Sequence, residues 1–146
     1  MSYFQYDNSS YVIREDISAA HAKFWDNLAS PGNWWTGAER IAISREVRNA
    51  LSCEYCTNRK KALSPYGFAG EHLHDGGLSE VAIDAVHRII TDQTRITKAW
   101  VDGNVEKGLS KGAYVELAGI AVAMLSIDEF HRALGLSLEG LPSPIP

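Results

Sequence analysis

The chain has 146 residues, and its 45% hydrophobic and 22% charged residues are typical of one ordinary globular domain. Its net charge of −4, with acidic and basic residues interspersed, argues against a nucleic-acid partner, which requires a basic surface. The longest apolar run, residues 120–125, is too short to cross a bilayer, and the N-terminus lacks a signal-peptide pattern. We therefore expect a cytoplasmic protein with no membrane partner.

The first quarter of the chain predicts an arm and two helices. Residues 1–14 are polar and aromatic without a clear period, which predicts an extended N-terminal arm. Apolar residues at helical spacing predict a helix over residues 17–28, which the Ser-Pro-Gly sequence 30–32 ends. Thr36 with Glu39 three residues later forms a capping box, which predicts that a second helix begins here.

Both cysteines lie in a third predicted helix. Ser52 is its expected N-cap, and the helix is expected to continue to residue 63, where Ser-Pro-Tyr-Gly ends it. Glycine, histidine and acidic residues at 68–77 then predict a loop.

The second half predicts three more helices and an extended tail. Ser79 and Ser110 are expected N-caps, the second for the last and longest helix, residues 111–134. Between these helices, apolar residues at 96–105 predict another. The proline-rich tail, within residues 137–146, cannot be helical and predicts a segment wrapped around the molecule.

These elements together predict an all-α fold of six or seven helices in a single domain, residues 1–146. No run alternates with the period of two that a strand requires. An apolar last helix and an arm at each end predict a homo-oligomer.

The two cysteines, Cys53 and Cys56, are the strongest chemical signal. Thiols at this spacing near a helix start favour a reversible disulfide, because the helix dipole stabilises thiolates and Arg59 or Lys60 follows on the same face. Two buried cysteines without a redox role are one alternative. A zinc site is another, with His72 and His74 completing a tetrahedral Cys2His2 set.

A redox pair also needs a group that moves protons. Glu116 lies in an otherwise apolar helix segment, so it is expected to be either paired or protonated, and either state suits a proton shuttle. Its alternative role is a structural ion pair with Arg40 or Arg45. His131 on the same helix and His87 on the apolar face of its own helix are further candidates, and core packing is the alternative for both.

The chain resembles the alkylhydroperoxidase D (AhpD)-like, carboxymuconolactone decarboxylase-related superfamily, in a peroxidase-related branch. The resemblance covers most of the chain from about residue 20 and rests on the following segments: 31–35, 38–43, 53–63, 85–89, 114–117 and 130–136. It implies an all-α oligomer with thiol-based peroxide or disulfide chemistry. It also implies that Cys56 is the attacking thiol and that Cys53 resolves the product.

The family's usual proton relay is missing from its usual positions. The relay histidine, four residues after the second cysteine, is replaced by Lys60, and the relay glutamate, twelve residues before the first, is replaced by Ile41. Glu116, His87 and His131 are candidate replacements, together with two carboxylates of the second helix, Glu39 and Glu46.

Three hypotheses follow. The first is an enzyme that reduces a small-molecule hydroperoxide or disulfide with its Cys pair, without cofactor or metal, and that a thiol reductant protein then reduces. The second is a non-catalytic redox sensor or ligand-binding protein on the same fold. The third is the Cys2His2 zinc site.

Overall fold

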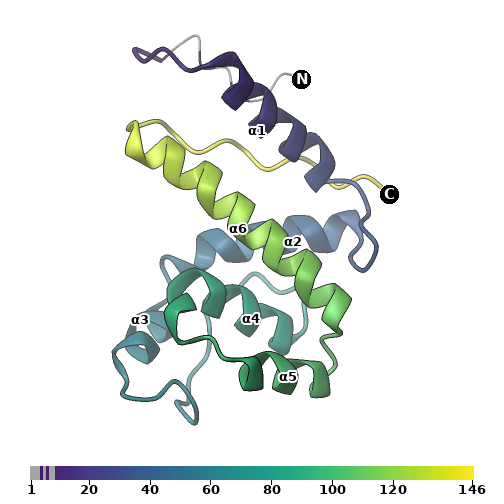
Figure 1. The fold of residues 1–146 in the computed structure, drawn as a ribbon, viewed down its shortest axis with the longest axis vertical. Helices are drawn as coiled ribbons and strands as arrows, with labels where there is room; N and C mark the ends of the chain where they lie inside the picture. Colours follow the sequence, from purple (N-terminus) through teal and green to yellow (C-terminus); the bar gives the residue numbers. More distant parts are fainter. Residues whose placement is uncertain (1–3, 5, 7–8) are drawn as a thin grey trace.

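The computed structural model describes residues 4, 6 and 9–146, and this part of the chain is all-α, as predicted (Figure 1). Within these residues, none of the helices combines the length and the apolarity that crossing a bilayer requires. The elements are α1 (Glu15–Leu28), α2 (Gly37–Ala50), α3 (Glu54–Lys61), α4 (Glu80–Thr91), the short 3-10 helix η2 (Gln93–Arg95), α5 (Lys98–Glu106) and α6 (Lys111–Ala133).

Three predicted helix starts are confirmed by their caps. The Thr36 hydroxyl accepts the amide of Glu39, and the Glu39 carboxylate accepts the amide of Thr36, which completes the capping box. Ser79 and Ser110 cap α4 and α6 through the same kind of hydroxyl–amide bond. Each such cap stabilises its helix by about 1 kcal/mol.

The predicted start of α3 is wrong by one residue. Its N-cap is Cys53, with an extended backbone (φ −82°, ψ 113°), and Ser52 lies in the turn that closes α2. The amides of both residues still bond to carbonyls of the last turn of α2, at 3.0 Å and 3.2 Å. The first bond of α3 instead runs from the Thr57 amide to the Cys53 carbonyl, at 3.1 Å, which makes Cys53 the N-cap. The helix also ends at Lys61 rather than at residue 63.

The core lies where α2, α4 and α6 pack against one another, and α1 adds two large side chains, Trp25 and Leu28, to its edge (Figure 1). Full burial of a side chain of this size contributes about 1.5–3 kcal/mol. The large apolar residues of the three central helices that are fully buried are Ile41, Ile43, Val47, Val86, Leu117 and Met124.

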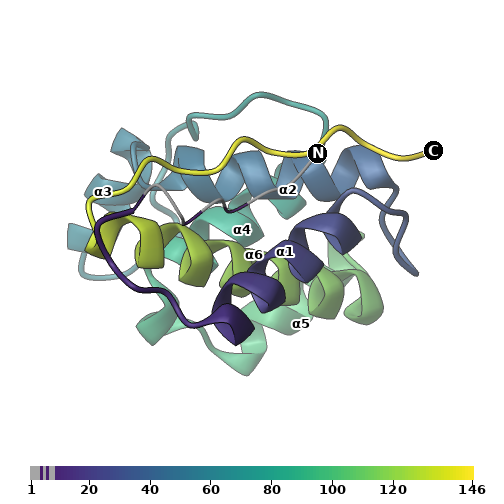
Figure 2. The ribbon, with the colours of Figure 1, turned by 90° about the horizontal axis from the view of Figure 1, so that it is seen from above.

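The proline-rich tail is extended, as predicted, and runs along α2 (Figure 2). Its carbonyls accept hydrogen bonds from the Trp25 indole (2.8 Å) and the Arg48 guanidinium (2.8 Å), and the Ile145 amide donates to Ala29. The predicted arm, residues 1–14, falls partly outside the described residues. Of its described part, Phe4 packs edge-on against Trp25.

Candidate functional site

The two cysteines lie where α2 ends and α3 begins. Cys53 is the N-cap of α3, Cys56 lies in its first turn, and each is only 1% exposed. Two imidazoles reach them: His72 from the loop between α3 and α4, and His87 from α4. One ligand atom from each of the four side chains lies within 4.8 Å of the other three. We call Cys53, Cys56, His72 and His87 the Cys–His cluster.

His87 joins Cys56 to a buried carboxylate on α2. Its Nδ1 lies 3.3 Å from Cys56 Sγ, and its Nε2 lies 2.7 Å from Glu46 Oε1. Because an ionised carboxylate only accepts, Nε2 carries the proton and Nδ1 presents its lone pair to the thiol. Burial lowers the pKa of His87 and outweighs the opposing effect of Glu46, so the ring is neutral near pH 7.

His72 is held in the same way by a second carboxylate. Its Nδ1 lies 3.4 Å from Cys56 Sγ and 3.6 Å from Cys53 Sγ, while its Nε2 lies 2.9 Å from Asp84 Oδ1. Burial alone would raise the pKa of Asp84, but the His72 hydrogen bond and the Arg59 guanidinium together lower it to about 2. Asp84 is therefore ionised, and it fixes the His72 proton on Nε2.

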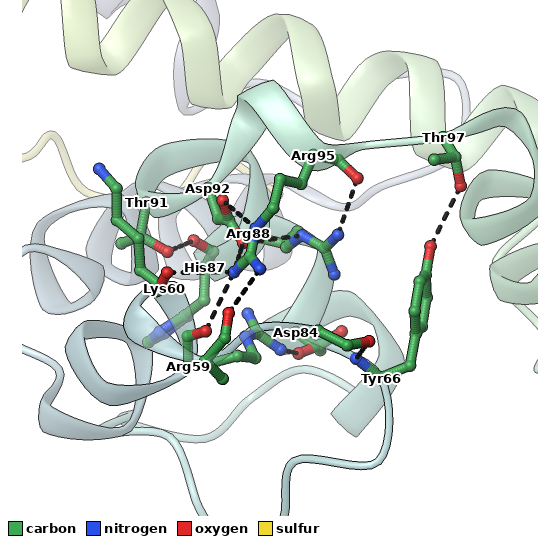
Figure 3. A network of polar contacts seen from close by, with 12 residues as sticks. Arg59, Lys60, Tyr66, Asp84, His87, Arg88, Thr91, Asp92, Arg95 and Thr97 are labelled. Carbon is green, nitrogen blue, oxygen red and sulfur yellow. Dashed lines mark hydrogen bonds and ion pairs between the residues drawn. The ribbon is translucent and has the colours of Figure 1, made fainter.

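A network of arginines holds the cysteine helix against α4 (Figure 3). Arg95 follows α4 and donates to three carbonyls at the end of α3, including Ala62 (2.8 Å) and Arg59 (3.0 Å). Asp92 accepts from the same guanidinium, and Arg59 itself donates to Asp84. The network therefore fixes the position of the thiols on α3 relative to His87 and Asp84 on α4.

The loop between α3 and α4, residues 62–79, covers the cluster. The Asp75 amide donates to Glu46 Oε2 at 3.0 Å, and the Leu73 amide donates to Cys53 Sγ at 3.3 Å. The first bond attaches the loop to the carboxylate that holds His87, and the second attaches it to a sulfur. Loop position and cluster geometry are therefore linked.

An open pocket of about 290 Å³ lies beside this loop. Its walls include Tyr55, Gly70, His72 and Asp84, so it reaches the outer side of the His72 imidazole. The Tyr55 hydroxyl donates to the Phe68 carbonyl, and a side chain at Gly70 would lie only 2.2 Å from the Tyr55 ring. The glycine therefore lets the loop pack closely over the aromatic ring next to the pocket.

The two thiols differ in acidity. Burial alone would raise the pKa of Cys53, but hydrogen bonds from the Cys56 and Leu73 amides hold it below its ordinary value. Burial raises the pKa of the Cys56 thiol to about 12. At neutral pH, Cys53 thus has more thiolate character, whereas Cys56 is a thiol facing the lone pair of His87.

Of the predicted site residues, the structure brings Cys53, Cys56 and His87 together, and it places Glu116 and His131 in other contacts. Glu116 binds Arg40 at 2.9 Å and accepts the Asn33 amide at 2.8 Å, near the start of α2, whereas the cysteines follow its end. His131 bonds through its two nitrogens to the Tyr6 hydroxyl and the Ser137 carbonyl, both at 2.7 Å.

The remaining candidates divide into residues that lie in the site and residues that lie outside it. Glu46 lies in the site, whereas Glu39 caps α2. Of the predicted zinc ligands, His72 belongs to the cluster, but His74 is exposed and accepts a backbone amide through its Nδ1. Lys60 is exposed as well.

Asp84, which holds His72 in the cluster, was not among the residues predicted from the sequence. A signal for it exists, because Asp84 precedes His87 by three residues and so lies on the same face of α4. The partner of Asp84 is nevertheless His72, which lies in a loop, and no helical periodicity predicts where a loop residue lies.

No protein-family model, curated protein or solved structure matches this chain. The resemblance to the AhpD-like superfamily therefore stays a prediction from the sequence.

Proposed function

We propose that the protein is a dithiol oxidoreductase that reduces a hydroperoxide and forms a Cys53–Cys56 disulfide. One observation carries the proposal: two buried thiols face two imidazole lone pairs, and each imidazole is fixed by its own carboxylate. This is the arrangement of nucleophile, base and orienting group that activates thiols. It provides a proton acceptor for each thiol.

In the first step, the Cys53 thiolate attacks the distal peroxide oxygen. The O–O bond breaks, Cys53 becomes a sulfenic acid, and the alkoxide leaves and takes up a proton as the alcohol. The lower pKa of Cys53 supports this role. The order is the reverse of the one that the family resemblance implies, in which Cys56 attacks.

In the second step, Cys56 attacks the sulfenic sulfur. Its pKa of about 12 leaves almost no thiolate at neutral pH, so this step requires a base. His87 Nδ1, 3.3 Å from the sulfur, takes the proton, and Glu46 stabilises the resulting imidazolium. The S–S bond forms as the hydroxyl leaves with that proton as water. An external dithiol then reduces the disulfide and restores both thiols.

The test combines thiol counting with single cysteine variants. The reduced parent is expected to lose both thiols for each equivalent of hydroperoxide, and Cys56→Ser is expected to stop at a sulfenic acid on Cys53. Cys53→Ser is expected not to react. Peroxide consumption by Cys53→Ser at the parental rate would show that Cys56 attacks. A parent that retains both thiols in excess hydroperoxide would refute the function.

A redox sensor is the second candidate, and the covering loop favours it. The Leu73 amide bonds directly to Cys53 Sγ, so oxidation of that sulfur has to disturb the loop. A sensor is expected to oxidise once and to change its protease sensitivity at residues 62–79. Repeated turnover with a dithiol reductant would identify the enzyme instead.

A further inference from the structure

The four donor atoms of the Cys–His cluster lie within 4.8 Å of one another, and three of their sulfur–nitrogen separations match those of a tetrahedral metal site. Zinc binds thiolate sulfur at about 2.3 Å and imidazole nitrogen at about 2.0–2.1 Å, so a tetrahedral site requires sulfur–nitrogen separations of about 3.5 Å. The separations of His87 from Cys56 and of His72 from Cys56 and Cys53 are 3.3 Å, 3.4 Å and 3.6 Å. The side chains therefore need little rearrangement to bind a metal ion.

Both imidazoles are also oriented as metal ligands. A histidine that binds a metal through one nitrogen typically donates its other N–H to a carboxylate, which fixes the tautomer and increases its basicity. His87 does this with Glu46 at 2.7 Å, and His72 does it with Asp84 at 2.9 Å. Both Nδ1 lone pairs are consequently directed at the sulfurs.

Charge and burial select the ion. Two thiolates and two neutral imidazoles around a divalent cation give a complex with no net charge, which a buried site tolerates. His87 and the cysteines are almost fully buried, and the Leu73 amide already donates to Cys53 Sγ, a bond that stabilises a thiolate. Mixed sulfur and nitrogen donors in a tetrahedron suit Zn²⁺ better than the hard cations Mg²⁺ and Ca²⁺.

We propose that the reduced protein binds one Zn²⁺ through Cys53 Sγ, Cys56 Sγ, His72 Nδ1 and His87 Nδ1, and that the bound ion protects the dithiol from oxidation. Binding displaces the two thiol protons, and oxidation to the disulfide removes both sulfur ligands and releases the ion. The ligand set differs from the one the sequence predicts, because His87 takes the place of His74. The metal site shares residues with the proposed oxidoreductase but does not depend on its turnover.

The binding test uses Co²⁺ and Zn²⁺ with the reduced full chain. One equivalent of Co²⁺ is expected to give sulfur-to-cobalt charge-transfer bands and the intense visible bands of a tetrahedral site, and Zn²⁺ is expected to displace it at a one-to-one ratio. His72→Ala and His87→Ala are expected to lose the tetrahedral spectrum, and His74→Ala is the matched control that keeps it. Asp84→Asn is expected to weaken Zn²⁺ binding about 10- to 100-fold, because it removes the carboxylate behind His72.

Several results would overturn the site. They are a parent without charge-transfer bands, a His72→Ala variant that is folded by circular dichroism and keeps the parental spectrum, and a His74→Ala variant that loses it. Replacement of His87 in the core can unfold the chain. The His72→Ala variant is therefore needed as well, because His72 lies in the covering loop.

Protection is measured separately, by counting thiols after hydroperoxide is added with and without Zn²⁺. Slower thiol loss in zinc supports protection, and an unchanged rate refutes it. If the parent binds Co²⁺ but never reacts with hydroperoxide, the oxidoreductase fails and the metal site stands. If the parent reacts with hydroperoxide but binds no metal, the metal site fails and the oxidoreductase stands.

Discussion

Replacement of Glu46 by glutamine tests the proposed base most directly. Both carboxylate oxygens accept hydrogen bonds: Oε1 from His87, and Oε2 from the Asn49 side chain and the Asp75 amide. A glutamine has only one acceptor oxygen, so its NH2 group must face one side. The other side faces two donors, the Asn49 side chain and the Asp75 amide, so the NH2 group faces His87. The ring then has to accept at Nε2 and carry its proton on Nδ1, where it cannot take a proton from Cys56.

The size of the effect follows from the bond that is lost. A hydrogen bond to a charged group contributes about 1.5–3 kcal/mol, and each 1.4 kcal/mol in a barrier is a factor of ten, so formation of the disulfide is expected to slow roughly 10- to 150-fold. The first oxidation, at Cys53, does not use Glu46 and is expected to keep its rate. A sulfenic acid on Cys53 should therefore accumulate.

The assay is a single-turnover reaction of the reduced chain with hydroperoxide, in which the sulfenic acid is trapped with dimedone and the disulfide is measured by mass spectrometry. Asn49→Ala is the matched control, because it removes a bond to Glu46 and one to Asp75 while leaving the contact with His87. If Glu46→Gln forms the disulfide at the parental rate without trapped sulfenic acid, the assignment of His87 as the base is refuted.

Four further predictions concern acidity, stability and access. Because a lower pKa gives more thiolate at a given pH, the ultraviolet thiolate signal of Cys56→Ser should rise below pH 9.0, whereas that of Cys53→Ser should stay low until about pH 12; equal midpoints would contradict this. Glu116→Gln removes the charge that binds Arg40, so it should lower the free energy of unfolding in urea by about 1–3 kcal/mol. Slower disulfide formation in this variant would instead support a role in proton transfer. Gly70→Ala should displace the Tyr55 ring and lower the free energy of unfolding by about 1–3 kcal/mol. It should also speed alkylation of both thiols, and an unchanged alkylation rate would contradict this. Free Zn²⁺ at a hundredfold excess over its dissociation constant should stabilise the reduced protein by about 2.7 kcal/mol, which raises the thermal midpoint by about 5–10 °C; a similar rise in a cysteine variant would argue against the site.

The fold could be predicted because its helix boundaries are encoded locally. Thr36, Ser79 and Ser110 are each the N-cap of a helix, and apolar residues at helical spacing follow them. The error at Ser52 has a physical cause as well. An N-cap is the residue whose carbonyl accepts the first hydrogen bond of the helix, and in α3 the Thr57 amide bonds to the carbonyl of Cys53.

The site could be predicted only in part, because its contacts depend on how the elements pack. The cysteine spacing is visible in the sequence, and His87 and Glu46 were candidates, but their pairing depends on the contact between α2 and α4. Glu116 drew attention as an acid in an apolar segment, and its polar partners come from the loop before α2 and from Arg40. The ion pair with Arg40 was one of the two expected from the sequence, whereas the backbone amides of the loop before α2 were not expected as partners.

The tail along α2 also bears on the order in which the chain is completed during synthesis. The Cys–His cluster and its two carboxylates all come from residues 46–87, so their partners leave the ribosome together. Trp25, by contrast, is fully buried, and its indole N–H bonds to the Gly140 carbonyl, which lies 115 residues later in the chain. The contacts of α1 are therefore complete only after residue 140 has been synthesised, whereas the residues of the cluster all lie in a segment that is complete earlier.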